Sequence, residues 1–321
     1  MINKSKIGSL LVKQEVILTL FTILVYITFS LISSNFATRS NFLSLLQQIS
    51  INGMCVVGMG LVVILGGIDL SVGAVLSLCG AVGGMAILAG HSVVVALLLS
   101  VGIGIVCGAF NAVLVTILQL PPIIATLASS YLFRGVSVWI TKGSWITALP
   151  REFTIYGTGR VLDIPNIFWM FIFILIAASL MMRYTNIGRK IYAVGTNNTA
   201  ADNAGIKTGR VKFFGYVLCS AVIGFAGLMY VAQMGALNVT NTALTLGNQL
   251  LAAALAGGIA IAGGKGVLPG AAIGIFMIGT IKNGLILSKA NEFWLDAITG
   301  VIILIALVLN VLNSKTRKGG I

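Results

Sequence analysis

Charged side chains are scarce in this chain of 321 residues. Asp, Glu, Lys and Arg make up 8% of it, whereas a soluble globular domain carries about 25%. Hydrophobic residues make up 58%, and the mean hydropathy is +1.07. These values exclude an ordinary soluble domain and predict a protein that crosses a membrane several times.

Side chains suited to catalysis or metal binding are scarce as well. His91 is the only histidine, which excludes a histidine-based triad or metal site. Cys55, Cys79, Cys107 and Cys219 stand singly in apolar runs without metal-ligand spacing, which indicates packing residues. The sequence therefore predicts no catalytic residue, metal or cofactor, and a membrane enzyme is disfavoured.

A nucleotide site is also missing. The glycine-rich run 258–266 resembles a phosphate-binding loop only briefly, because Lys265 is followed by Gly266 rather than by Ser or Thr. The run also follows an apolar span instead of a strand. If this chain pumps a solute, a partner must supply the energy.

Long apolar segments dominate what is present. A helix needs about 20 apolar residues to span a bilayer. Ten segments approach that length, at 14–34, 43–66, 72–89, 93–117, 122–140, 164–182, 212–233, 246–262, 267–287 and 295–312. The segment 141–163 is of mixed polarity, and we expect it to be an outer loop. We therefore predict an all-α polytopic membrane protein with about ten transmembrane helices, forming a single domain over residues 1–321. Arg134 and Lys282 fall inside spans, where their side chains could extend to the outer surface.

Glycine is abundant, with 39 residues, which favours close contacts between helices. The span 93–117 carries Gly104-x3-Gly108-x2-Asn111, and the span 267–287 carries Gly270-x3-Gly274 and Gly279-x3-Asn283. This faint repeat favours two inverted halves, as in many transporters.

A basic polar segment, Arg183–Lys212, separates two apolar runs. Its six cations face one acid, Asp202. Such a segment cannot lie in lipid, and loops rich in Lys and Arg stay in the cytoplasm. Ten spans then place thirteen basic residues inside (Lys4, Lys6, Lys13, Arg183, Arg189, Lys190, Lys207, Arg210, Lys212, Lys265, Lys315, Arg317 and Lys318) and five outside (Arg39, Lys142, Arg151, Arg160 and Lys289). This asymmetry predicts cytoplasmic termini and a cytoplasmic 183–212 loop.

The same loop has helix-forming content. Residues 199–204 can form a turn or two of helix, with Asn197 or Asn198 as N-cap and Gly205 as the C-terminal stop. A soluble partner could bind there. The alternative is a solvated loop whose charges only set topology.

A pathway would be lined by small polar residues. The candidates are Gln47, Gln48, Asn52, Asp69, Asn111, Ser129, Ser130 and Asn283. Asp69 could instead cap the helix that follows it, and the others could join helices to one another. The near absence of buried ionisable groups disfavours a secondary transporter, and a pathway without fixed charge suits a neutral solute such as a sugar.

Four motifs together suggest a family. The stretches Asn41–Val75 (with GGIDLSVG), Ile123–Gly135, Gly188–Ile206 and Ala262–Gly274 (with AGGKG) are similar to the ribose-type sugar permeases of bacterial ABC importers, in the branched-chain permease superfamily. The resemblance covers nearly the whole chain. It implies a type II (vitamin-B12-type) importer fold in the bacterial inner membrane. It also implies three partners: an ATPase with two fused nucleotide-binding domains, an extracytoplasmic sugar-binding protein and a second permease subunit, either a copy or a paralogue.

The resemblance also implies roles for particular residues. The family's cytoplasmic coupling helix matches Gly195, Asn197, Asn198, Thr199, Ala200, Ala201, Asp202, Gly205 and Ile206. Asn198 and Asp202 depart from the family's usual Glu and Arg, and Ile259-Ala260 replaces the Thr-Ser pair common in ribose permeases. The stretch Lys142–Pro150 is nearer to autoinducer-2 permeases. The solute could therefore be a pentose, autoinducer-2 or a similar polyol. A branched-chain amino acid is the alternative.

Overall fold

The computed structural model describes residues 14–239 and 246–289, together with single positions between 294 and 304. Its elements are α2 (Gln14–Ile32), α3 (Arg39–Ile64), α4 (Val72–Leu88), α5 (Val93–Thr116), α6 (Pro122–Thr141), α7 (Arg151–Thr158), β1 (Arg160–Val161), β2 (Ile164–Pro165), α8 (Asn166–Tyr184), α9 (Asn186–Thr196), α10 (Asn198–Asn203), α11 (Thr208–Met234), α12 (Leu246–Ala256) and α13 (Leu268–Leu287). Six of these helices, α3, α5, α6, α8, α11 and α13, are long and apolar enough to cross a membrane. The chain is therefore a polytopic helical membrane protein. The predicted tenth span, 295–312, lies outside the continuously described residues.

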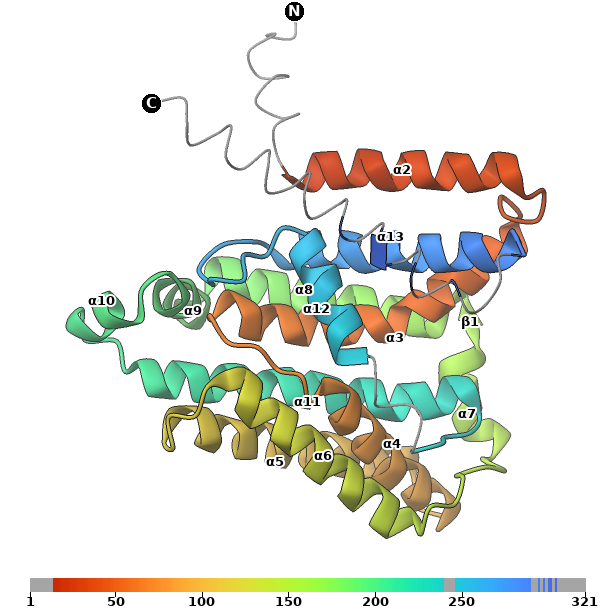
Figure 1. Cartoon of the computed structure of the whole chain (residues 1–321). Helices are drawn as coiled ribbons and strands as arrows, with labels where there is room; N and C mark the ends of the chain where they lie inside the picture. The colour runs from red at the N-terminus through yellow and green to blue at the C-terminus, as the bar shows by residue number, and fades with distance from the viewer. Residues whose placement is uncertain are drawn as a thin grey trace, which may run out of the picture.

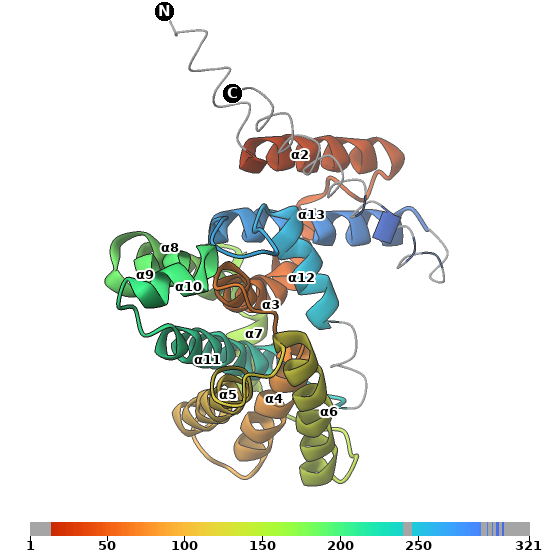
Figure 2. The same cartoon turned by 60° about the vertical axis from the view of Figure 1, so that its left-hand side comes forward.

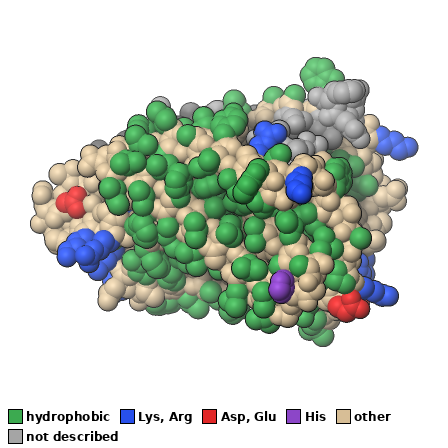
Figure 3. Space-filling model, turned by 90° about the horizontal axis from the view of Figure 1, so that it is seen from below, with side chains coloured by type: hydrophobic (Ala, Val, Ile, Leu, Met, Phe, Trp, Pro, Cys, Tyr) green, Lys and Arg blue, Asp and Glu red, His purple; other side chains and the backbone are tan. Residues whose placement is uncertain are grey.

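The long helices run side by side, and short elements close the two ends of the bundle (Figure 1). Helices α9 and α10 lie at one end, and α7 with the β1–β2 hairpin lies at the other. Figure 3 shows a broad hydrophobic surface between ends that bear charged side chains. Leu98 of α5 and Phe173 of α8 are examples of large apolar side chains that are exposed. The distribution is the one expected of a protein surrounded by lipid.

The segment 141–163, which the sequence analysis assigned to a loop, contains regular structure. Helix α7 buries Phe153, and β1 pairs with β2 in an antiparallel hairpin. Leu162 and Asp163 form its two-residue turn with φ of 53° and 64°, the left-handed conformation that such tight hairpins require. These elements are too short, and their sequence is too polar, for hydropathy to distinguish them from a loop.

Glycine lets α5 and α11 approach closely, as expected. A Cβ on Gly104 would lie 2.3 Å from the Ser220 carbonyl oxygen, and one on Gly108 would lie 2.6 Å from that of Tyr216. No side chain fits in such gaps, so backbone packs directly against backbone.

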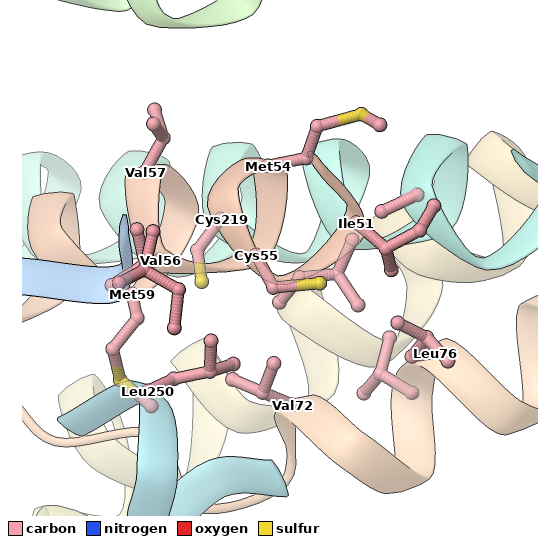
Figure 4. Close-up of a cluster of buried hydrophobic side chains, with 14 of the residues drawn as sticks. Ile51, Met54, Cys55, Val56, Val57, Met59, Val72, Leu76, Cys219 and Leu250 are labelled. Atoms are coloured by element: carbon pink, nitrogen blue, oxygen red, sulfur yellow. The ribbon is translucent and has the colours of Figure 1, made fainter. Parts of the chain in front are cut away.

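The centre of the bundle is apolar and includes the cysteines. Figure 4 shows Cys55 of α3 and Cys219 of α11 among Met54, Val72 and Leu250. All four cysteines are buried and free of disulfides, which confirms their interpretation as packing residues.

The predicted span 246–262 is wrong at its end. Helix α12 stops at Ala256, and Gly258 adopts a φ of 92°, which ends regular helix. The chain then loops through 257–267 before α13 begins. We call residues 262–266 of this connection the AGGKG turn.

Helix α2 lies at the edge of the bundle, beside α13 (Figure 2). The ring of Phe29 packs so tightly on Gly284 that a Cβ there would lie 2.3 Å from it. The Ser33 hydroxyl donates to the Leu287 carbonyl oxygen at 3.4 Å. The opposite face of α2, with Leu24 and Leu31, is exposed.

Candidate functional site

Helix α10 has a well-defined signal at each end. The Asn197 side chain accepts a hydrogen bond from the Ala200 N–H at 3.0 Å, which is the predicted N-cap. At the other end Gly205 has a φ of 81°, and the Ile206 N–H donates to the Ala201 carbonyl oxygen. This is a Schellman motif. The predicted short helix and both of its boundary residues are confirmed.

Most of α10 faces outward. Its exposed members are Asn198, Thr199, Ala200, Asp202 and Asn203, whereas Ala201 is buried. The Asp202 carboxylate accepts from the Thr208 hydroxyl at 2.7 Å, at the first residue of α11. A negative charge at a helix N-terminus is stabilising. Asp202 therefore fixes α10 against α11.

Helix α9 was not predicted, although its signal is present in the sequence. Ile187, Ile191 and Val194 follow helical spacing, and the last two are buried. Thr185 caps its start by accepting from the Gly188 N–H at 3.2 Å. Basic residues interrupt this apolar pattern and make the stretch polar overall, which is typical of a loop.

The end of α9 is wedged between two other chain segments. A Cβ on Gly195 would lie 1.9 Å from the Ile64 carbonyl oxygen and 2.6 Å from the Gly264 nitrogen. The Gly264 N–H itself donates to the Ile64 carbonyl oxygen at 2.7 Å. Three segments, the end of α9, the end of α3 and the AGGKG turn, thus meet at one point. We call it the glycine junction.

A side-chain bond ties α9 to the same turn. The Tyr192 hydroxyl donates to the Gly266 carbonyl oxygen at 2.9 Å. Burial raises the pKa of Tyr192 above its ordinary value, so the phenol keeps its proton at physiological pH. Helix α9 is therefore in direct contact with both the end of α3 and the AGGKG turn.

The connection between α3 and α4 is held inside the bundle by polar side chains. Asp69 is fully buried, and its Oδ1 accepts from the Ser71 N–H at 2.8 Å and from the Ser71 hydroxyl at 2.5 Å. Asn111 of α5 donates to the Ser71 hydroxyl at 2.8 Å, and the Leu70 N–H donates to Thr126 of α6 at 3.1 Å. This connection is thus bonded to two further helices.

These contacts correct the expected capping role of Asp69. Its carboxylate bonds the N–H of Ser71, the N-cap residue itself, and no side chain caps α4. Within the described part of the chain, Asp69 Oδ2, Asn111 Oδ1 and the Tyr216 hydroxyl are buried without a hydrogen-bond partner. Buried orphan polar atoms are rare in folded proteins. Asp69 itself is fully buried inside the protein and faces neither solvent nor lipid.

The other pathway candidates do not form one group. Asn283 is buried, and its side-chain amide forms two hydrogen bonds with that of Asn41, at 2.8 and 3.0 Å. These bonds join α13 to α3. Gln47 donates to the Gly157 carbonyl oxygen at 3.4 Å, near α7. Gln48 is exposed and Asn52 is half-buried, one turn apart on α3.

A small polar hollow lies where α6 faces α12. It measures about 90 Å³ and is lined by Leu70, Leu127, Ser130, Tyr131, Arg134, Gly247 and Asn248. Ser130 was a predicted pathway residue, whereas its neighbour Ser129 is buried and bonds the Thr126 carbonyl oxygen. Sequence reasoning missed Arg134 and Asn248. Arg134 was interpreted as reaching the surface, and only the fold places Asn248 opposite it.

No group of three or more potential metal ligands exists among the residues whose positions are described.

Comparison with known proteins gives consistent matches over nearly the whole chain. Residues 41–307 match the family described as branched-chain amino acid transport system / permease component. The chain is 34% identical over 305 residues to the ribose import permease protein RbsC of Escherichia coli K12, covering 94% of each chain. It is 32% identical over 295 residues to the autoinducer 2 import system permease protein LsrC of Yersinia pseudotuberculosis, covering 92% of this chain and 82% of the relative. No solved structure matches.

Proposed function

Because this chain belongs to the family of branched-chain amino acid transport system permease components, we propose that it is the membrane-spanning subunit of an ATP-driven importer of a small sugar. The observation that carries the proposal is the outward-facing α10, fixed through α9 to the interior of the bundle at the glycine junction. The two relatives named above act on ribose and on autoinducer 2, which supports a pentose or a similar polyol as the solute.

Helix α10 is proposed as the docking site for the ATPase. Its exposed Thr199, Ala200 and Asn203 are small or neutral, so they can enter a cleft on a partner without burying charge. A push on α10 would pass through α9 to Gly195 and from there to α3 and the AGGKG turn. An ATPase with two fused nucleotide-binding domains would dock one such helix from each of two permease subunits.

The solute pathway is proposed to pass the hollow between α6 and α12. Arg134, Ser130 and Asn248 offer hydrogen-bond donors and acceptors suited to hydroxyl groups. The hollow of about 90 Å³ is well below the roughly 300–1,000 Å³ of complete ligand pockets. A second permease subunit, either a copy or a paralogue, would complete it, and an extracytoplasmic sugar-binding protein would deliver the solute.

The proposed topology places α9 and α10 in the cytoplasm. Apart from Arg134 and Lys282, which lie within α6 and α13, seven of the described basic residues belong to that end of the bundle (Arg183, Arg189, Lys190, Lys207, Arg210, Lys212 and Lys265) and five to the α7 end (Arg39, Lys142, Arg151, Arg160 and Lys289). The excess agrees with the positive-inside rule. Ten spans in two inverted halves and the type II importer architecture are part of the same proposal.

Reconstitution tests the function directly. The chain is co-expressed with its ATPase and binding protein, placed in proteoliposomes, and assayed for uptake of labelled ribose, autoinducer 2 and leucine. We expect sugar uptake that requires ATP on the α10 side. Uptake of leucine alone would reassign the solute to the amino-acid class. Uptake by the isolated chain under an ion gradient would establish a secondary transporter instead.

A further inference from the structure

A large groove lies beside α9, and it is not part of the proposed solute pathway. It measures about 640 Å³ and lies between the end of α8, helix α9 and the beginning of α13. It is lined by Ser179, Met182, Arg183, Arg189, Tyr192, Val267, Leu268 and Pro269.

The lining of the groove is amphipathic. Met182 and Leu268 are buried apolar side chains, and Val267 and Pro269 continue the apolar surface. Two exposed guanidinium groups, those of Arg183 and Arg189, form its cationic part. No acid lines the groove, and the ion pair found within the described residues, Arg39–Asp163, lies at the opposite end of the bundle. The occupant that complements this lining carries an anionic group joined to an apolar chain.

Both arginines are held in place by neutral neighbours. The Arg183 guanidinium lies 5.3 Å from the centre of the Tyr184 ring, and Arg189 donates a hydrogen bond to the Asn186 side chain. These contacts orient the guanidinium groups but bring no acid from the described residues to them, so an anion would add a charge-assisted interaction.

The groove also lies at the level of the membrane where a phospholipid headgroup would be found. Arg183 lies in the last turn of α8, and Leu268 is the first residue of α13, so both membrane-spanning helices end there. Lipid headgroups lie at that level, with acyl chains directly beneath. One turn deeper, the Ser179 hydroxyl is buried without a hydrogen-bond partner among the described residues. It could donate to an ester oxygen just below a phosphate.

We propose that this groove is a binding site for an anionic glycerophospholipid. The phosphate binds Arg183 and Arg189, and an acyl chain lies along Met182 and Leu268. A free phosphate ion shares the anionic chemistry but makes no use of the apolar floor. Basic pockets between membrane helices at the cytoplasmic face bind anionic headgroups elsewhere by the same physics.

Native mass spectrometry of the detergent-purified chain tests the proposal. The protein is equilibrated with equal amounts of phosphatidylglycerol and phosphatidylcholine, with or without millimolar inorganic phosphate. The test variant is R183Q/R189Q. The control is K190Q/R210Q, which removes two exposed charges from the same end outside the groove. All four side chains are exposed, so both variants should fold.

We expect wild type and control to retain phosphatidylglycerol over phosphatidylcholine by about tenfold, and R183Q/R189Q to lose that preference. Inorganic phosphate should displace little of the lipid. The proposal is overturned if wild type shows no preference, or if the control loses it equally, since diffuse charge would then explain binding. Displacement by inorganic phosphate would overturn it as well and identify a simple anion site.

Discussion

At the scale of single residues, Asp69 is the buried group whose environment was hardest to anticipate. The motif Gly66–Gly73 contains cap-forming residues, so the sequence favoured a capped helix start. The structure uses the carboxylate to fold the α3–α4 connection and to bond α5 through Ser71 and Asn111. Those partners lie up to 42 positions away, at Asn111, and no local pattern reveals them.

We predict that Asp69→Asn folds and transports with moderately reduced activity. Asn keeps an acceptor for the Ser71 N–H, so we expect a loss of at most about one hydrogen bond, about 1 kcal/mol, which corresponds to about fivefold in an equilibrium. Uptake in proteoliposomes and the thermal unfolding midpoint check this. Complete loss of uptake with normal ATPase binding would show that Asp69 belongs to the pathway or gate.

Gly195 gives the sharpest steric prediction. A Cβ 1.9 Å from the Ile64 carbonyl oxygen must displace α9, at a cost of about 1–3 kcal/mol. We expect Gly195→Ala to insert in the membrane but to lose most solute-stimulated ATP hydrolysis. The matched control is Gly209→Ala, in the first turn of α11, where a Cβ meets nothing within 4 Å. Equal activity of the two variants would refute transmission through the glycine junction.

At the scale of elements, α10 was predictable and α9 was missed. Helix α10 has local signals, Asn197 before it and Gly205 after it, which act whatever surrounds them. Helix α9 also has a local cap, at Thr185, but its apolar face is short and lies among basic residues, so burial of Ile191 and Val194 against the bundle is what distinguishes it from a loop. The early end of α12 combines the positive φ of Gly258 with a contact that the sequence does not show, in which Gly257 packs directly on Gly270 of α13. Elements shaped by tertiary contacts are the ones that sequence alone describes poorly.

The exposed face of α10 is tested by Ala200→Arg. Ala200 is exposed, so the new side chain should leave the fold intact while clashing in the cleft of a docked ATPase. We expect loss of both uptake and co-purification of the ATPase, with normal membrane insertion. Ala200→Ser, small and neutral, should retain both. If Ala200→Arg co-purifies and hydrolyses ATP normally, the docking surface lies elsewhere, with the AGGKG turn as the next candidate.

At the scale of the whole molecule, the polytopic helical class and most span positions were predictable from hydropathy. The packing of spans was not, because in lipid one apolar face resembles another and contacts depend on shape. The glycines indicated that close pairs exist without identifying them. Only the fold shows that Gly104 and Gly108 pair α5 with α11.

Topology is tested by labelling single cysteines in a chain whose four native cysteines are replaced. Thr196 and Ser144 are both exposed, one at the end of α9 and the other between α6 and α7. We expect a membrane-impermeant maleimide added outside intact cells to label Ser144→Cys and to leave Thr196→Cys unlabelled until the cells are opened. Labelling of both from outside would contradict the ten-span arrangement.

The edge position of α2 has a consequence for how the protein is made. Its main described partner, α13, is synthesised long afterwards, since Ser33 and Leu287 are 254 residues apart. At about 5–20 residues per second, translation covers that interval in roughly 13–50 seconds. Throughout that time the face of α2 that bears Phe29 lacks the helix against which it packs in the complete structure. The contact between α2 and α13 therefore joins two helices that are synthesised far apart in time.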